Sequence, residues 1–235
     1  MAEAHPYQIT SLGDAALLVQ FGNTIDEGIN QKVLQLFRKL QALQLPYIID
    51  VVPAYSSLAV YYDVYQLLQK EKGFKAFEFV AQLLKNILHQ PTAEEVQSRN
   101  AIQIPVCYAP AWAPDMEAVA LQKNLSIEDV ISLHTTPQYT VYMIGFLPGF
   151  AYMGKVDSRI AVERHVQPRL QIEAGSVGIA GLQTGIYPLA SPGGWQIIGR
   201  TPLSLFQKEQ PNPVRLQPGD KVQFYAITEN EFKNY

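Results

Sequence analysis

Hydrophobic residues in the first ninety positions alternate between the spacing of β-strands and the spacing of amphipathic helices. Apolar residues recur every three or four positions from Asp26 to Leu45 and again from Phe74 to His89, which predicts two helices that end before Pro46 and Pro91. Short apolar runs flanked by turn residues predict four strands, at 7–10, 15–21, 47–52 and 58–63. This mixture predicts a small α+β domain over residues 1–95.

The pattern changes after residue 91. Thr92–Asn100 is polar and has no period, so it is predicted to be a linker. The next elements are predicted to be a strand at 101–108, a short helix from Asp115, its expected cap, to Lys123, and a second helix opened by a capping box at Ser126 and ending near His134. After Pro137, strands and turns are predicted to the end of the chain. Residues 96–235 are therefore expected to form a β-rich barrel domain.

The composition of the 235-residue chain narrows the classes of protein that it can represent. With 48% apolar and 17% charged residues, it can bury a sizeable core. Its net charge of -3 gives no electrostatic signature of nucleic-acid binding. The single cysteine, Cys107, excludes an intrachain disulfide and fits a cytoplasmic protein, and the N-terminal residues do not resemble a secretory signal. The four histidines lack the spacing of metal ligands, so no metal site is expected.

The segment Gly145–Pro202 is the most unusual part of the sequence. It carries ten of the fifteen glycines, and residues 175–199 contain no Asp, Glu, Lys or Arg. Prolines and glycines within that run argue against a membrane-spanning helix and favour short buried strands joined by tight turns, whose backbone a ligand can approach closely. Trp195 is predicted to be a partly exposed aromatic residue. The candidate substrate-binding positions are Gly145, Phe146, Pro148, Gly149, Phe150, Gly175, Ser176, Gln183, Thr184, Tyr187, Gly193, Gly194 and Trp195.

A charged segment, residues 163–173, interrupts this run of glycines and apolar residues. It contains Arg164, His165 and Arg169. Arginine binds carboxylates and phosphates through two parallel hydrogen bonds, and histidine transfers protons near neutral pH. The same composition is typical of a solvated hairpin tip, and the residues alone leave both interpretations open.

Two further patterns allow a functional and a structural interpretation. Gly194–Thr201 has the spacing of a phosphate-binding loop with Arg200 in place of lysine, but its bulky spacer and the lack of a following helix favour a strand. His134 ends a predicted helix, where the helix dipole favours the protonated ring and a structural role is the simplest.

Three long motifs resemble the family of KipI and allophanate hydrolase subunit 1, which also contains a subunit of ATP-dependent 5-oxoprolinases. They are GFLPGFAYMG, PRLQIEAGSVGIAGLQTGIYP and SPGGWQIIGRTP. The resemblance implies a small α+β domain followed by a cyclophilin-like barrel. The chain departs from the family pattern at Glu163-Arg164-His165, at Ile172–Ser176 and at Tyr108-Ala109-Pro110. The basic positions that match are Arg164, Arg169 and Arg200, and together with His134 they are the expected catalytic residues.

The resemblance also implies a function that depends on partners. The first expectation is a 5-oxoprolinase subunit that is inactive alone, uses ATP as a co-substrate without a tightly bound cofactor, and acts with a KipA or allophanate-subunit-2-type protein and a LamB/YcsF-type protein. The alternatives are an inhibitor of a sensor histidine kinase and a carboxyltransferase subunit of an allophanate hydrolase or urea carboxylase type. The motifs are common to all three. In each case we expect the candidate side chains to converge on one face of the barrel.

Overall fold

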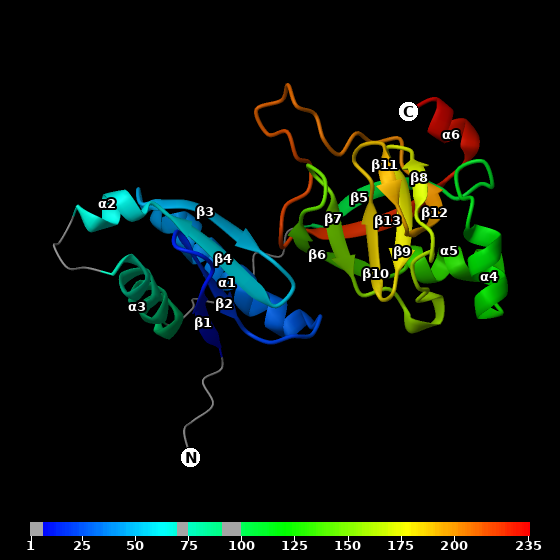
Figure 1. Cartoon of the computed structure of the whole chain (residues 1–235). Helices are drawn as coiled ribbons and strands as arrows, with labels where there is room; N and C mark the ends of the chain where they lie inside the picture. The colour runs from blue at the N-terminus through cyan, green and yellow to red at the C-terminus, as the bar shows by residue number, and fades with distance from the viewer. Residues whose placement is uncertain (1–6, 70–74, 91–99) are drawn as a thin grey trace, which may run out of the picture. The chain divides into compact units, whose positions relative to one another are not determined.

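The computed structural model describes residues 7–69, 75–90 and 100–235 (Figure 1). The chain divides into two compact units, residues 1–97 and 98–235. The linker predicted at Thr92–Asn100 lies outside the described residues except for Asn100, and so does the predicted boundary at residues 95 and 96. None of the described helices is both long enough and apolar enough to cross a membrane.

The first unit is an antiparallel four-stranded sheet with helices packed against it, which confirms the predicted α+β arrangement. The strands lie in the order β1-β2-β4-β3. A buried cluster joins sheet and helices, with Leu17 and Val60 on the strands and Leu36 and Leu84 on the helices. The elements are β1 (Gln8–Ser11), β2 (Ala16–Gln20), α1 (Glu27–Leu43), β3 (Ile48–Pro53), β4 (Ser57–Tyr62), α2 (Val64–Leu68) and α3 (Ala76–His89).

Local sequence explains where these helices begin and end. The Asp26 carboxylate accepts a hydrogen bond from the Ile29 amide at 3.0 Å and caps α1, and Gln44 ends the helix in the left-handed conformation. The five-residue helix α2 was not predicted, because it is too short to show a helical period. Phe74, the predicted start of α3, lies outside the described residues.

The second unit is built around a closed barrel, which confirms the predicted architecture. The strands follow the order β10-β7-β6-β13-β5-β12-β9, and β13 and β5 form a parallel pair. The barrel strands are β5 (Ile102–Cys107), β6 (Gln138–Ile144), β7 (Ala151–Gly154), β9 (Ser176–Ala180), β10 (Gln183–Ile186), β12 (Gln196–Arg200) and β13 (Lys221–Ile227). Since Gln196–Arg200 is a barrel strand, the segment with phosphate-loop spacing is a strand, as its bulky spacer predicted.

Shorter elements surround the barrel. They are α4 (Met116–Lys123), α5 (Ile127–Thr135), η1 (Ser158–Ile160), β8 (Arg169–Ile172), β11 (Ser191–Gly193) and α6 (Glu229–Lys233). Strands β8 and β11 pair with each other in a separate two-stranded ribbon. The capping box predicted at the start of α5 is present between Ser126 and Asp129. Helix α6 was not predicted, although Thr228 and Glu231 form a second capping box at its start.

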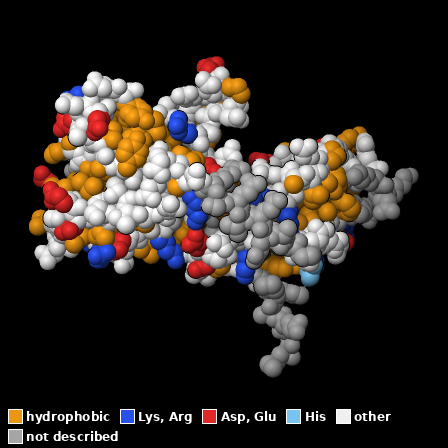
Figure 2. All heavy atoms as spheres, turned by 180° about the vertical axis from the view of Figure 1, so that it is seen from behind, with side chains coloured by type: hydrophobic (Ala, Val, Ile, Leu, Met, Phe, Trp, Pro, Cys, Tyr) orange, Lys and Arg blue, Asp and Glu red, His pale blue; other side chains and the backbone are white. Residues whose placement is uncertain are grey.

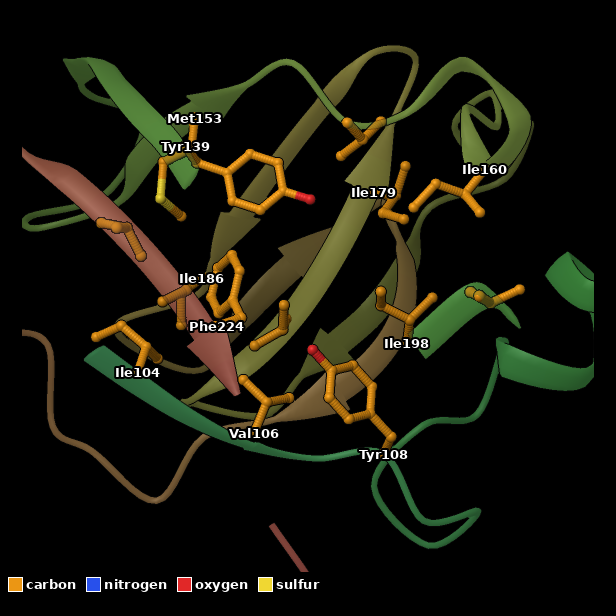
Figure 3. Packing of buried hydrophobic residues seen from close by; sticks show 14 of the residues in the cluster. Ile104, Val106, Tyr108, Tyr139, Met153, Ile160, Ile179, Ile186, Ile198 and Phe224 are labelled. Atoms are coloured by element: carbon orange, nitrogen blue, oxygen red, sulfur yellow. The ribbon is translucent and has the colours of Figure 1, made fainter. Parts of the chain in front are cut away.

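Aromatic and branched side chains fill the barrel. In Figure 3, the rings of Tyr108, Tyr139 and Phe224 enter the interior from different parts of the chain, among Ile104, Val106 and other aliphatic residues. All of them are almost fully buried. At the surface, hydrophobic side chains lie among interspersed Lys, Arg, Asp and Glu (Figure 2). The interior is thus a packed core, and candidate binding residues must be sought on the outer side of the barrel.

Candidate functional site

An aromatic layer covers the outer side of strands β9 and β10. We define it as Phe150, Tyr187 and Trp195, with Ile172, Ala180 and Ile197 packed among them. The rings of Phe150 and Trp195 meet edge to face, with centroids 5.4 Å apart. Burial raises the pKa of the Tyr187 phenol.

Glycines in the barrel wall allow this layer to form. Along β10, Thr184 and Ile186 point into the barrel, so Gln183 and Gly185 face outward. A β-carbon at Gly185 would lie 3.0 Å from the Trp195 ring, and one at Gly178 would lie 3.1 Å from its Cβ. Because these contacts are tighter than normal packing, a side chain at either position would push Trp195 away. The prediction that Trp195 is partly exposed is wrong, since it is only 4% exposed.

An exposed aromatic residue, Phe146, lies next to the layer and is 61% accessible to solvent. It lies in the loop between β6 and β7, where Phe146 has a φ of 69° and Gly149 a φ of 83°. Its ring stands edge-on to Phe150, with a centroid distance of 5.6 Å. The loop residues Gly145, Pro148 and Gly149 thus present one exposed ring beside the buried aromatic layer.

Arg164 lies over the ring of Trp195, with its guanidinium carbon 5.9 Å from the ring centroid. Its neighbours are held by one hydrogen bond to Gly194, in the β11–β12 connection, and one to Gln196, the first residue of β12. The His165 amide donates to the Gly194 carbonyl at 2.7 Å, and the Gln196 side chain donates to the Glu163 carbonyl at 3.0 Å. Arg164 is exposed, and within the described residues no carboxylate forms an ion pair with it. Its charge is therefore available to an anion.

Arg169 has a different environment, because its guanidinium is bound to the buried carboxylate of Asp115. The two side chains form parallel hydrogen bonds of 2.8 and 2.5 Å. One carboxylate oxygen also accepts the Ile197 amide at 2.6 Å, and the other lies 3.3 Å from the His165 ring. Asp115 is the N-cap residue of α4, as predicted, but its side chain makes no capping hydrogen bond. The carboxylate instead ties β12 to the charged segment.

His134 lies inside the barrel and away from the aromatic layer. Its ring contacts the Tyr108 hydroxyl at 2.8 Å through Nδ1 and the Thr184 hydroxyl at 2.9 Å through Nε2. Thr184 donates its own hydrogen to the Gly178 carbonyl, so Nε2 is the donor and Nδ1 accepts from Tyr108. Burial lowers the pKa of His134 to about 3, so desolvation outweighs the helix dipole that was expected to favour the charged ring.

Arg200 occupies a third environment, at the far end of β12. Its Nε donates to the Ala174 carbonyl at 2.8 Å, and its guanidinium carbon lies 5.2 Å from the centre of the Trp112 ring. Gly175, beside Ala174, has a φ of 84° and packs so closely on the Thr201 carbonyl that a side chain would overlap it. Ser176 is buried and faces Arg200 across the β9–β12 pair.

The candidate residues are therefore divided among three places. The structure brings Phe146, Phe150, Arg164, Tyr187 and Trp195 together around the aromatic layer. Gly193 lies next to the Tyr187 hydroxyl, and the Gly194 carbonyl accepts the His165 amide, so both glycines lie beside this set. Gln183 faces outward on β10, the strand that also carries Gly185. His134 and Thr184 lie in the interior, whereas Gly175 and Ser176 adjoin Arg200, whose guanidinium lies over Trp112. The candidate side chains therefore do not all converge on one face of the barrel, although the sequence predicted that they would.

Sequence reasoning missed the part played by Asp115 and Trp112. Asp115 resembled a helix cap because it stands immediately before α4, and nothing local indicates a partner 54 residues away. Among the described residues, no group of three or more His, Cys, Asp or Glu side chains could hold a metal ion.

Comparison with known proteins agrees with the motifs. The family model for the carboxyltransferase domain, subdomain C and D, matches residues 7–216. The 5-oxoprolinase B subunit of Bacillus subtilis is 42% identical over 231 residues, which are 97% of this chain and 96% of the relative. The protein of the same name from Escherichia coli O157:H7 is 35% identical over 91% of this chain and 93% of its own length.

A solved structure supports the fold. The crystal structure of TTHA0988 superposes with a TM-score of 0.75 at 34% identity and covers 90% of this chain. The present chain spans 40% of the length of that protein. Both the expected barrel architecture and the family resemblance are thus confirmed. The chain belongs to the carboxyltransferase subdomain C and D family and groups with the 5-oxoprolinase B subunits in it.

Proposed function

We propose that this chain is the B subunit of a 5-oxoprolinase, which opens the lactam of 5-oxoproline to glutamate while ATP is hydrolysed. The observation that carries the proposal is the alignment with the B subunit of the Bacillus subtilis 5-oxoprolinase, which extends over nearly the whole length of both chains. The proposed partners are a KipA or allophanate-subunit-2-type protein and a LamB/YcsF-type protein, supported by the naming of that relative as one subunit of an enzyme. A cytoplasmic location stays a prediction from the sequence.

The chemistry of the reaction indicates what this chain contributes. A lactam carbonyl is a poor electrophile, and transfer of a phosphoryl group from ATP to its oxygen makes it susceptible to water. The species in that sequence carry carboxylate and phosphoryl charges, and an arginine that lacks an acidic partner binds either group. Arg164 fits this requirement, whereas Arg169 is already paired with Asp115. We propose that Arg164 and the aromatic layer form the anion-binding part of a site that the partner subunits complete.

A reconstitution experiment tests the function. The isolated chain is expected to release no glutamate from 5-oxoproline and ATP, because Arg164 and the aromatic layer form only the anion-binding part of the proposed site. Mixing it with purified KipA-type and LamB/YcsF-type partners is expected to produce glutamate and ADP in equal amounts. Turnover by the chain alone would contradict its role as an obligate subunit. No turnover by the complete mixture would contradict the function itself.

Replacing Arg164 with alanine tests the anion-binding role. The reconstituted complex is expected to lose about tenfold or more in kcat/KM, since hydrogen bonds to charged groups are worth about 1.5–3 kcal/mol. The melting temperature should stay unchanged, because the Arg164 side chain is exposed. Arg159→Ala is the matched control, because Arg159 is an exposed arginine on η1 that pairs with Asp157 instead. Equal activity of the two variants would remove Arg164 from the site.

A further inference from the structure

Arg164 lies in the first part of the charged segment, residues 163–168, which is neither helix nor strand. An isolated bridge between Val162 and Gly181 lies just before this part, and β8 begins after it at Arg169. Between these points the backbone is irregular, and Val166 is 98% exposed. A segment of this kind needs specific contacts to keep one of its side chains in place, because backbone freedom costs about 1–2 kcal/mol per ordered residue.

Asp115 supplies such contacts to the segment at Arg169 and His165. Its carboxylate is almost fully buried and binds the Arg169 guanidinium through both oxygens. His165, next to Arg164, completes the cluster, since its Nε2 lies 2.9 Å from the Arg169 Nη1 and 3.3 Å from the Asp115 Oδ1. The same carboxylate accepts the Ile197 amide of β12. Asp115 thus joins the residue after Arg164, the first residue of β8 and the barrel wall.

Trp195 lies close in sequence to the β12 amide that Asp115 binds, so the contacts of Asp115 bear on the placement of Arg164. Trp195 lies two residues before Ile197, so the amide that Asp115 binds and the ring under Arg164 belong to one short stretch of chain. Although Asp115 is the N-cap residue of α4, its carboxylate makes no capping bond to that helix. The contacts of the buried carboxylate are instead those with Arg169, His165 and the Ile197 amide.

We infer that Asp115 is a positioning residue that, through Arg169 and His165, holds the Arg164 guanidinium over Trp195. Outer contacts of this kind fix the orientation of a binding group, and their loss typically costs about 10–100-fold in function at other sites. The inference rests on the proposed function for its effect on activity, but the placement of Arg164 over Trp195 is measurable without any activity.

The first test measures the surroundings of Trp195 directly. Trp112 and Trp195 are the two tryptophans of the chain, so a Trp112→Phe background leaves one indole. The Trp195 ring is only 4% exposed, so quenching by either agent is weak and the two are compared as a ratio. The guanidinium over the ring should attract iodide, an anionic quencher, more than acrylamide, which is neutral. The ratio of iodide to acrylamide quenching is therefore expected to fall about twofold in Arg164→Ala, because the local cation is lost. Asp115→Asn is expected to give nearly the same fall with Arg164 still present.

Two further variants serve as controls for this test. Asp157→Asn is the matched control, because the Asp157 carboxylate also binds an arginine, Arg159, through two hydrogen bonds, at an exposed position. This variant should leave the ratio of iodide to acrylamide quenching unchanged. If Asp115→Asn does not fold, Arg169→Lys takes its place, since lysine keeps the charge but cannot form both bonds. A wild-type ratio in a folded Asp115→Asn or Arg169→Lys variant would overturn the inference, and so would a wild-type ratio in Arg164→Ala.

A double-mutant cycle in the reconstituted complex separates positioning from a general structural effect. Asp115→Asn is expected to raise the KM about tenfold, and Arg164→Ala combined with it should be no worse than Arg164→Ala alone, because Asp115 acts through Arg164. Additive losses would overturn the inference. If the wild-type complex has no 5-oxoprolinase activity, the proposed function fails, while the quenching ratios still decide whether Asp115 positions Arg164.

Discussion

Replacing Arg169 with alanine is expected to lower the free energy of unfolding by about 3 kcal/mol. The Asp115 carboxylate would keep the Ile197 amide as a partner but lose both guanidinium bonds within a buried environment. Removing one partner of a buried ion pair typically costs about 3–5 kcal/mol, and we expect the lower end because the Arg169 side chain is 33% exposed. Denaturant unfolding at pH 7 measures the difference.

The control for this prediction is Arg159→Ala, which breaks another bidentate arginine–aspartate pair, at an exposed position. Exposed ion pairs contribute about 0–1 kcal/mol, so this variant should unfold at nearly the wild-type denaturant concentration. A second variant isolates the cause. Asp115→Asn combined with Arg169→Met removes both charges and should cost less than Arg169→Ala alone, because no buried ion is left without a counterion. Equal stability of Arg169→Ala and wild type would mean that solvent replaces the guanidinium at no cost.

The main elements could be predicted because their signals are local. The apolar spacing in α1 and α3, the caps at Asp26 and Ser126 and the short apolar runs of the strands all lie within about a dozen residues. The ends of elements and very short helices were harder to predict. Helix α2 is an example, since five residues are too few to show a helical period. The strand and turn pattern predicted a β-rich barrel, but the order of its strands could not be predicted from local signals, because the pairings join strands as distant as β5 and β13.

The candidate site was less predictable, because it depends on which distant groups meet. Arg164 and Arg169 lie five positions apart in one charged segment, yet one faces solvent over Trp195 and the other binds a buried carboxylate. The sequence offered Arg169 many possible acids, and burial of Asp115 is a property of the folded barrel. Likewise, nothing near Trp195 indicated that Gly178 and Gly185 would let its ring lie against the barrel wall.

The pH dependence of stability is the other prediction with a large expected effect. His134 is fully buried, and desolvation lowers its pKa from 6.5 to about 3 in the folded chain. Between these two values the unfolded chain binds a proton that the folded chain does not, so stability rises with pH and is lost as pH falls below 6.5. One such proton changes the free energy of unfolding by about 1.4 kcal/mol per pH unit. From pH 7 to pH 5 we therefore expect a loss of about 2 kcal/mol.

Between pH 7 and pH 5, the effect of His134 on stability can be distinguished from that of the acidic side chains. The pKa of Asp157 is lowered to about 2 by its hydrogen bonds to Arg159, so its contribution to stability is lost only below its unfolded value, near pH 4. Unfolding curves at pH 7, 6 and 5 should show the slope in wild type and in His165→Gln. His134→Gln should start from a lower stability, since it disturbs the bonds to Tyr108 and Thr184, but should lose the slope. An unchanged slope in His134→Gln would show that the buried histidine is not the group that makes the fold sensitive to mild acid.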